Sequence, residues 1–363
     1  MRRGKIIGII IAVLVATGTG LFFLIGFLTY GTIFSSGSQF YTPGLIRSPE
    51  PILIRTDIGK INVRYNTSET ENVVKVDYNI RMSGTYMIGK SITDFFVIEW
   101  DNITYVASDK TTFVLRTKPG VSLDPTNWFS IKQIEINVTL RTDLIYSIEE
   151  YATTGKMVND IPNEVTIDGL YLETTTGNSL INLDQASVRS FRIEATTGEI
   201  SVYAKKSNFT SGIIATATTG NLRLNFSSCL INGDIDAEIT TGTLVFNSYN
   251  FRCLANVDWD LETTTGSINC DIIQNVEMGG NVDCEGVVST GNINIDYIDT
   301  SSIIGATFLG TTTTGQFNPT NSGGFENVGL TQFSSLDWSS ANYTFLFDLT
   351  TTTGNINIDG QSN

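Results

Sequence analysis

The chain has 363 residues, a formal net charge of −15 and no histidine. The absence of histidine excludes Ser-His-Asp and Cys-His catalysis and histidine-ligated metals, so the sequence predicts a protein that is not an enzyme. The acidic balance also argues against nucleic acid and anionic lipid surfaces as partners, because an acidic body repels both.

The N-terminal residues have the pattern of a membrane anchor. Three basic residues lie in residues 1–5, and an uncharged apolar run follows over residues 6–28. A run of this length spans a bilayer as one helix, and the preceding basic residues place the short tail in the cytoplasm. A signal peptide cleaved near Ala16–Gly18 is the alternative, although cleavage there would leave an apolar new terminus. We expect a single-pass protein of the cell membrane, with residues 29–49 as an extracellular linker and the rest outside the cell.

The tripeptide Thr-Thr-Gly recurs along the rest of the chain. Its successive glycines are 22, 21, 22, 22, 24, 25, 24 and 39 residues apart, and one triplet reads Ser-Thr-Gly. A period of roughly 20 to 25 residues is typical of a solenoid in which each repeat forms one coil. The nine glycines are Gly155, Gly177, Gly198, Gly220, Gly242, Gly266, Gly291, Gly315 and Gly354.

Apolar residues keep fixed distances from each of these glycines. The position seven residues before the glycine is apolar in all nine repeats, and the positions two and four residues after it are apolar with few exceptions. This alternation is strand periodicity, with the glycine at a corner between two strands. The sequence predicts an all-β fold, a parallel β-solenoid with coils of about 22 residues, preceded by one transmembrane helix. An antiparallel sandwich of hairpins is the alternative, but it does not explain the recurring corner.

The same pattern extends upstream of the first Thr-Thr-Gly. Around Gly59 apolar residues occupy the same offsets without the threonines, which predicts a degenerate first coil. Residues 50–150 are expected to hold this coil and an irregular β-rich cap, and residues 151–363 the repeats. In the gap before the last glycine, a coil without a corner signal is expected at Phe325–Leu336. The candidate cap strands are Val73–Arg81, Asp94–Trp100, Thr111–Arg116 and Ile134–Leu140.

Three consecutive repeats carry acidic residues at outward-facing offsets. If the coils stack, like charges lie on neighbouring strands, which is destabilising, and calcium would relieve the repulsion because it takes several carboxylate oxygens. The alternative is a solvated acidic face that salt screens. No cofactor other than calcium is expected. The eight residues are Asp234, Asp236, Glu238, Asp258, Asp260, Glu262, Asp283 and Glu285.

The four cysteines form an even number, which suits a compartment where disulfides persist. Cys229 and Cys253 each lie thirteen residues before a corner glycine, so they are expected to stack and can form a disulfide between coils. Cys270 and Cys284 both fall at inward offsets, where they either bridge the core or fill it as small apolar residues.

Asparagines suggest two further features. Six Asn-x-Ser/Thr sequons permit glycosylation of an exterior domain, namely Asn66, Asn102, Asn137, Asn208, Asn225 and Asn342. An asparagine column three residues after the corner is expected to form a hydrogen-bonded ladder, and it comprises Asn269, Asn294, Asn318 and Asn357. The stacked threonines before each glycine are expected to play the same structural role.

With this register, the chain resembles the adhesin-type β-strand-repeat family of bacterial and archaeal surface proteins, a domain of unknown function. The likeness covers residues 50–360 and rests on three motifs. They are G-x-I-x-V at Gly59–Val63, a V-x-L-R-T-D type strand at Val138–Asp143, and repeats such as T-G-x-I-x-V at Thr197–Val202. The resemblance implies a right-handed β-solenoid at the cell surface with an adhesive role, and it carries over no functional residues.

These features favour a membrane-anchored surface protein, adhesin-like or structural, that binds surface glycans or proteins through its outward faces. One alternative is an envelope sensor or regulatory subunit that acts with a membrane partner. Another is a calcium-dependent glycan-binding or lyase solenoid that uses the acidic face.

Overall fold

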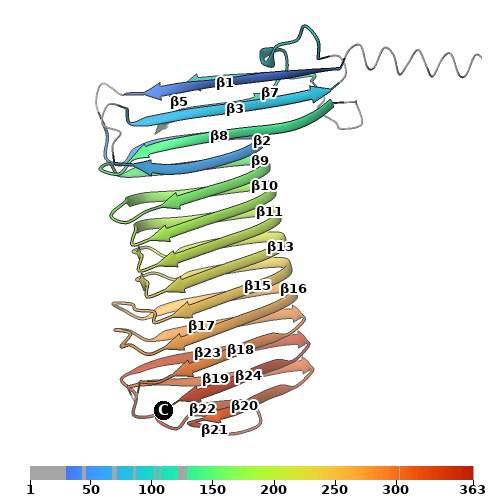
Figure 1. Cartoon of the computed structure of the whole chain (residues 1–363). Coiled ribbons are helices and arrows are strands. Elements are labelled where there is room, and N and C mark those ends of the chain that lie inside the picture. The colour runs from blue at the N-terminus through green and yellow to red at the C-terminus, as the bar shows by residue number, and fades with distance from the viewer. Residues whose placement is uncertain are drawn as a thin grey trace, which may run out of the picture.

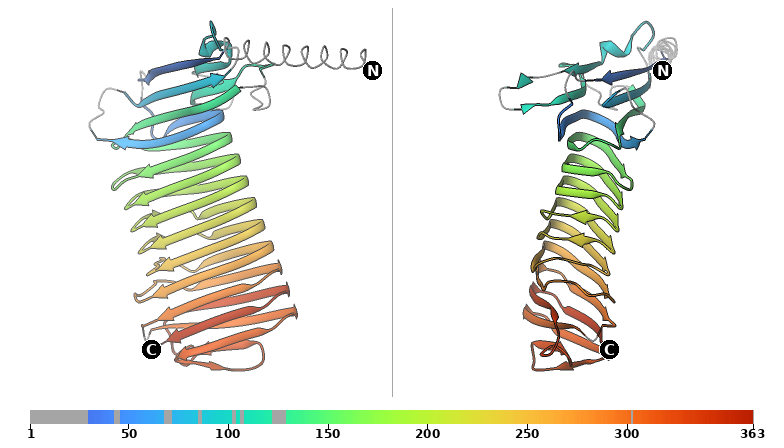
Figure 2. Two further views of the ribbon diagram at one scale, coloured as in Figure 1. Left: turned by 45° about the vertical axis from the view of Figure 1, so that its right-hand side comes forward. Right: turned by 90° about the vertical axis from the view of Figure 1, so that its left-hand side faces the viewer.

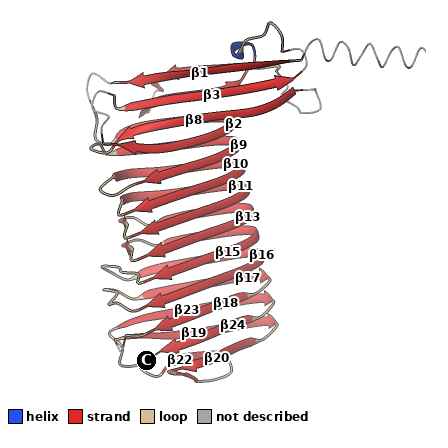
Figure 3. Cartoon of the chain, in the orientation of Figure 1, coloured by secondary structure: helices blue, strands red, loops and turns tan. Residues whose placement is uncertain are grey.

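The computed structural model describes residues 30–42, 46–67, 72–84, 87–101, 104–105, 108–121, 129–301 and 303–362. Over these ranges the chain is all-β, and its helical content is one short 3-10 turn, η1 (Ile92–Asp94). One sheet of 22 strands, most of them parallel, runs through the molecule, and β5 (Thr104–Tyr105) and β6 (Ser108–Asp109) form a separate pair. The strands lie as rungs along one long axis (Figures 1 and 3).

The repeats supply the long strands of the stack. In the earlier repeats one strand runs through the corner glycine: β9 (Tyr146–Ile161), β10 (Thr166–Asp184), β11 (Ser187–Lys205), β13 (Ile213–Ser227), β15 (Ile235–Tyr249) and β16 (Val257–Gln274). We call the segments before and after the corner glycine the first and second arm of a coil. In the last three repeats the two arms are separate strands: β17 (Val282–Thr290) and β18 (Ile293–Asp299), β19 (Ile304–Thr314) and β20 (Phe317–Gly323), β23 (Tyr343–Thr353) and β24 (Ile356–Ser362). Short return strands are β12 (Asn208–Phe209) and β14 (Leu230–Ile231).

Successive coils pair in parallel with their corner glycines opposite one another. Gly177 lies opposite Gly155, and Gly220 lies between Gly198 and Gly242. The register counted from the glycines is therefore confirmed for these coils. At Gly198 the φ angle is 141°, and a Cβ would lie 1.6 Å from the carbonyl oxygen of Gly177. Glycine recurs at this corner because any side chain would collide with the coil before it.

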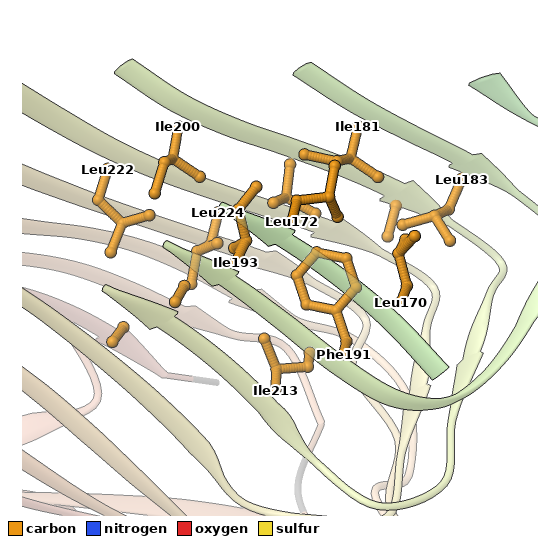
Figure 4. Packing of buried hydrophobic residues seen from close by; sticks show 14 of the residues in the cluster. Leu170, Leu172, Ile181, Leu183, Phe191, Ile193, Ile200, Ile213, Leu222 and Leu224 are labelled. Carbon is orange, nitrogen blue, oxygen red and sulfur yellow. The ribbon is translucent and has the colours of Figure 1, made fainter. Parts of the chain in front are cut away.

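Inward side chains of the two arms meet in a narrow core. In β10, Leu170 and Leu172 come from the first arm and Ile181 and Leu183 from the second, and all four are buried. Figure 4 shows them packed beside Phe191. Burying one such side chain stabilises the fold by roughly 1.5–3 kcal/mol. An aromatic column continues along the core with successive ring centroids 4.8–6.1 Å apart: Phe191, Phe209, Phe226, Phe246 and Trp259.

A second corner follows the second arm of four coils and is built without glycine. The corner residues have φ between 51° and 56° and are Gln185, Lys206, Ser228 and Asn250. Each backbone N–H donates to a carbonyl oxygen of the next coil, as from Lys206 to Ser227 at 2.8 Å. These hydrogen bonds hold non-glycine residues in the left-handed region, which side chains otherwise disfavour. Because four different residue types occupy this corner, no sequence motif marks it.

The N-terminal strands confirm the degenerate first coil. β2 (Glu50–Asn66) pairs in parallel with β9 and sets Gly59 opposite Gly155. The predicted cap strands are observed as β3 (Val74–Gly84), β4 (Phe96–Asp101), β7 (Thr111–Thr117) and β8 (Phe129–Arg141). β8 pairs in parallel with β2, and β3 pairs antiparallel with β8. The cap therefore continues the stack beyond its first coil.

A further strand, β1 (Gly31–Tyr41), occupies most of the predicted linker, so that part of the linker prediction is wrong. β1 pairs antiparallel with β3 over its whole length. Ile33 is its one buried residue, so the strand lacks the apolar alternation that would have revealed it. The predicted anchor at residues 6–28 lies outside the described residues. Within the described ranges, no helix is long and apolar enough to cross a bilayer.

The last coils stack out of chain order. β23 pairs with both β17 and β19, and β24 pairs with both β18 and β20. The coil of Gly354 is therefore internal and the coil of Gly315 lies outside it, at the end of the stack far from β1 (Figure 2). The coil expected at Phe325–Leu336 is instead an antiparallel hairpin of β21 (Phe325–Asn327) and β22 (Gln332–Ser335). β22 also pairs antiparallel with β19.

Candidate binding groove

A groove of about 600 Å³ runs across the outer side of five coils, from β9 to β15. Its first column consists of residues five positions after a corner glycine, and the strand register places Asn182 beside both Asp160 and Tyr203. Tyr203 in turn lies beside Asn225. A second column, two positions further along each strand, runs from Asp184 to Tyr249. The groove is thus a direct product of the repeat register.

Two tyrosines give the groove its apolar surface. Tyr203 is 44% exposed and Tyr249 is 37% exposed, and both line the groove. They belong to coils two rungs apart, so their rings are separated by roughly 10 Å along the stack. Each ring presents an apolar face to solvent and a hydroxyl group at its tip, which suits ligands that have both apolar and polar faces.

Hydrogen bonds along the columns hold the polar side chains in place. The Asn182 amide donates to Asp160 Oδ1 at 2.7 Å, and the Tyr249 hydroxyl donates to Asp271 Oδ2 at 2.8 Å. The Asp271 carboxylate raises the pKa of Tyr249, with partial burial adding to the shift. Tyr249 is therefore neutral at physiological pH and its ring is held in a fixed orientation.

Sequence reasoning missed this groove, although the signal was present. Tyr203 lies five residues after Gly198, at an outward offset. Tyr249 lies seven residues after Gly242 and is the last residue of β15. Aromatic residues at outward offsets of a strand are the signal, because an outward ring has no core to fill.

The eight predicted acidic residues are all exposed, so their outward orientation is confirmed. Asp260 lies opposite both Asp236 and Glu285, and Glu262 lies opposite Glu238. Asp234 lies before β15, where its Oδ1 accepts a hydrogen bond from the backbone of Asp258 at 3.0 Å. The reordered last coils add Asp348, opposite Glu285.

Repulsion in this face is visible in the carboxyl pKa values. Partial burial first, and the neighbouring Asp236 second, raise the pKa of Asp260. Partial burial and then Glu238 raise the pKa of Glu262 in the same way. Among the described residues no group of three or more acidic, cysteine or histidine side chains is arranged to hold a metal ion. The predicted calcium ligands therefore do not converge, because side chains on a flat strand face point outward in parallel.

The predicted disulfides are not formed, since all four cysteines are free and buried. Leu230 pairs with Arg252, which leaves Cys229 and Cys253 two residues out of register. Two residues along a strand and one rung across separate the Cα atoms by roughly 8 Å, which exceeds disulfide reach. The return segments stay in register with the preceding corner, whereas the prediction counted back from the following corner.

Cys270 and Cys284 fill the core as thiols. Cys270 lies between Phe246 and Ile295, and Cys284 lies between Trp259 and Phe347. Burial raises the pKa of Cys270 to about 12 and that of Cys284 well above its ordinary value. Of the two predicted roles for this pair, small apolar filling is the one observed.

The sequons differ in their exposure. Asn66 and Asn342 are exposed, whereas Asn137 and Asn225 are half-buried and accept hydrogen bonds from Asn62 and Asn247. The Asn208 Oδ1 atom is buried and has no hydrogen-bond partner among the described residues. Asn102 lies outside the described residues. Glycan attachment at Asn66 and Asn342 stays a prediction, and the other described sites are sterically less suited.

The predicted asparagine ladder is confirmed. Asn294 donates to Asn269 at 2.8 Å, Asn357 donates to Asn294 at 2.8 Å, and Asn318 donates to Asn357 at 3.1 Å. The order of donors follows the observed stacking and not the chain. The ladder therefore stabilises the last coils across the point where their order is exchanged.

No family model matches the chain, and no curated protein does. Among solved structures, the chain is similar to a candidate cell adhesion protein from Clostridium sporogenes, with 13% identity, a TM-score of 0.26, and coverage of 90% of this chain and 99% of the other. It is also similar to a candidate adhesin from Bacteroides fragilis, with 13% identity, a TM-score of 0.34 and coverage of 90% and 96%. A third similar structure is a candidate adhesin from Parabacteroides merdae, with 13% identity, a TM-score of 0.41, and coverage of 73% of this chain and 90% of the other.

Proposed function

We propose that the stack is a β-solenoid held at the cell surface by the anchor at residues 6–28, and that it acts as an adhesin-like binding protein. The observation that carries the proposal is the groove with Tyr203 and Tyr249 on its rim. Its role is binding, without a chemical step. The ligand that fits best is an extended chain of sugar residues lying along the stack.

Three properties of the groove support a glycan ligand. The two tyrosine rings supply flat apolar faces against which sugar rings can pack. Asp160, Asn182 and Asn225 supply fixed acceptors and amide donors for hydroxyl groups. The groove crosses five rungs, so a linear ligand meets the same kind of contact repeatedly, as a repeat architecture favours. A calcium ion has no part in this proposal.

A glycan array probed with the full-length protein tests the proposal. We expect binding to a set of linear glycans, and we expect Tyr203→Ala and Tyr249→Ala each to weaken it roughly five- to tenfold. Tyr171→Ala is the matched control, because Tyr171 lies on the first arm of its coil, away from the groove. The proposal fails if no glycan binds, or if all three variants bind as the wild type does.

The array also addresses the calcium-dependent alternative. If binding follows the acidic face, it should vanish with chelator and survive loss of Tyr203 and Tyr249. Our proposal predicts the reverse result in both arms, since the groove and the acidic face lie on different arms of the coils.

A further inference from the structure

The end of the stack near residue 30 exposes aromatic residues. Tyr30, Phe34 and Phe40 are 53%, 63% and 52% exposed. Phe34 and Phe40 are separated by an even number of residues, so both project from the same face of β1, and Tyr30 directly precedes the strand. Ile88, which is 63% exposed, lies on the other face, where a Cβ on Gly31 would come within 3.2 Å of its backbone nitrogen. Apolar side chains thus flank β1 on both sides.

β1 is also an open edge of the sheet. It pairs with β3 on one side, and no described strand pairs with its other side. The strand carries no charge and no proline, which are the usual means of protecting such an edge. An edge of this kind can pair with a strand of another chain unless something covers it.

Basic residues lie beside the aromatic rings. Arg81 on β3 is exposed and lies opposite Phe34. Lys75, also on β3, holds its ammonium group 5.9 Å from the centre of the Phe40 ring and forms an ion pair with Asp77 at 2.9 Å. Aromatic rings next to cations are the combination found where proteins meet the headgroup layer of a membrane.

Charge is distributed unevenly along the stack. Residues 30–145 contain twelve basic and twelve acidic residues, whereas residues 253–363 contain thirteen acidic residues and no lysine or arginine. An anionic surface therefore repels the far end but not the β1 end, whose charges balance. The acidic excess that argued against lipid surfaces lies after residue 145, away from the β1 end.

We propose that the β1 end of the stack rests in the headgroup layer of the membrane that holds residues 6–28. Tyr30, Phe34 and Phe40 reach the boundary with the acyl chains, while Arg81 meets lipid phosphates. The headgroup layer retains water, so the unpaired backbone groups of β1 stay solvated there. This inference rests on the proposed anchoring, because the apolar run ends directly before Tyr30.

The test uses the full chain in phosphatidylcholine vesicles with and without phosphatidylglycerol. Ser36→Cys places a label between Phe34 and Phe40, and Ser339→Cys is the matched exposed position at the far end. The native thiols are buried, with raised pKa values, so a thiol-reactive NBD dye labels the introduced cysteine. Vesicle flotation reports anchoring, and quenching by doxyl-labelled lipid reports contact with the bilayer.

We expect quenching at position 36 and none at position 339 on vesicles of either composition. The double variant F34S/F40S should reduce quenching at position 36 roughly twofold or more while flotation persists. Flotation without quenching at position 36 would overturn this inference and leave the anchoring intact. Failure to float would overturn the anchoring and this inference with it. If the double variant does not fold, the difference in quenching between positions 36 and 339 in the otherwise unchanged chain still tests whether the β1 end contacts the bilayer.

Discussion

Glu150 places a carboxyl group in the core of the first Thr-Thr-Gly coil. It is fully buried, and the strand register sets it between Ile54 and Leu172. Neither carboxylate oxygen has a hydrogen-bond partner among the described residues. Burial raises the pKa of Glu150 to about 8, and the nearby Asn159 amide opposes part of this shift. The carboxyl group is therefore mostly protonated in the folded protein at neutral pH.

The raised pKa makes stability depend on pH. In the unfolded chain the pKa returns to its ordinary value of 4.5. Above that value the unfolded chain loses the proton that the folded chain keeps, so the free energy of unfolding falls by about 1.4 kcal/mol per pH unit. The stability contribution is complete below pH 4.5 and is lost as pH rises through about 8. The total loss is roughly 5 kcal/mol.

Glu150→Gln tests this reasoning, because glutamine has nearly the same shape and does not titrate. We expect the melting temperature of E150Q to match that of the wild type at about pH 5 and to exceed it by several degrees at about pH 9. Glu149→Gln is the control, since Glu149 forms an ion pair with Lys110 on the outer side of the same strand. If the difference in melting temperature between E150Q and the wild type is the same at pH 5 and pH 9, the assignment of a buried, protonated carboxyl group is refuted.

Three further substitutions probe the stack by melting temperature. Gly198→Ala should lower the melting temperature sharply and the free energy of unfolding by more than roughly 3 kcal/mol, because the new Cβ meets a backbone oxygen. Gly329→Ala should leave both unchanged, because there is open space around Gly329. Ser228→Gly should stabilise by roughly 0.5–1 kcal/mol, since φ at Ser228 is 54° and glycine adopts this conformation without strain; no gain would contradict the strain assigned to the second corner. Asp260→Asn should raise the melting temperature at neutral pH and less so in acid or high salt, because the raised pKa reflects destabilisation of the charged form. An unchanged melting temperature for D260N would mean that salt and solvent already cancel the repulsion.

The repeat register was accessible from sequence because glycine at the first corner is sterically obligatory. Counting from Gly59 and Gly155 gave the pairing of β2 with β9, which the structure reproduces. The outward orientation of the acidic residues followed from the same count. The second corner escaped prediction, because backbone hydrogen bonds and not a residue type create it.

The predicted stacking of Cys229 on Cys253 was wrong because a count from one corner glycine does not show where extra residues enter a coil. The coil from Gly242 to Gly266 is two residues longer than the one before it. Those residues enter after the return segment, so Cys253 moves two positions relative to Cys229. A sequence count fixes distances along the chain, whereas contact between coils depends on where the extra residues enter.

The exchanged order of the last coils follows from backbone chemistry. The segments after Gly291 and Gly354 both read Asn-Ile-Asn-Ile-Asp, so β18 and β24 place isoleucine on isoleucine and asparagine on asparagine. The segment after Gly315 instead contains Pro319, which has no N–H to donate and is tolerated at the edge of a sheet. Stacking in chain order would place the proline strand inside and leave β24, with a full set of donors, exposed at the end.

The two ends of the stack are consequently finished in different ways. At the far end Pro319 interrupts the donors of β20, and the hairpin of β21 and β22 covers β19. At the near end β1 has neither device, although it is eleven residues long and uncharged. An unprotected edge is a site where a strand of another chain can add unless something covers it. The end that lacks its own protection is the end closest along the chain to residues 6–28, and the membrane anchor that we propose there would bring a bilayer to cover it.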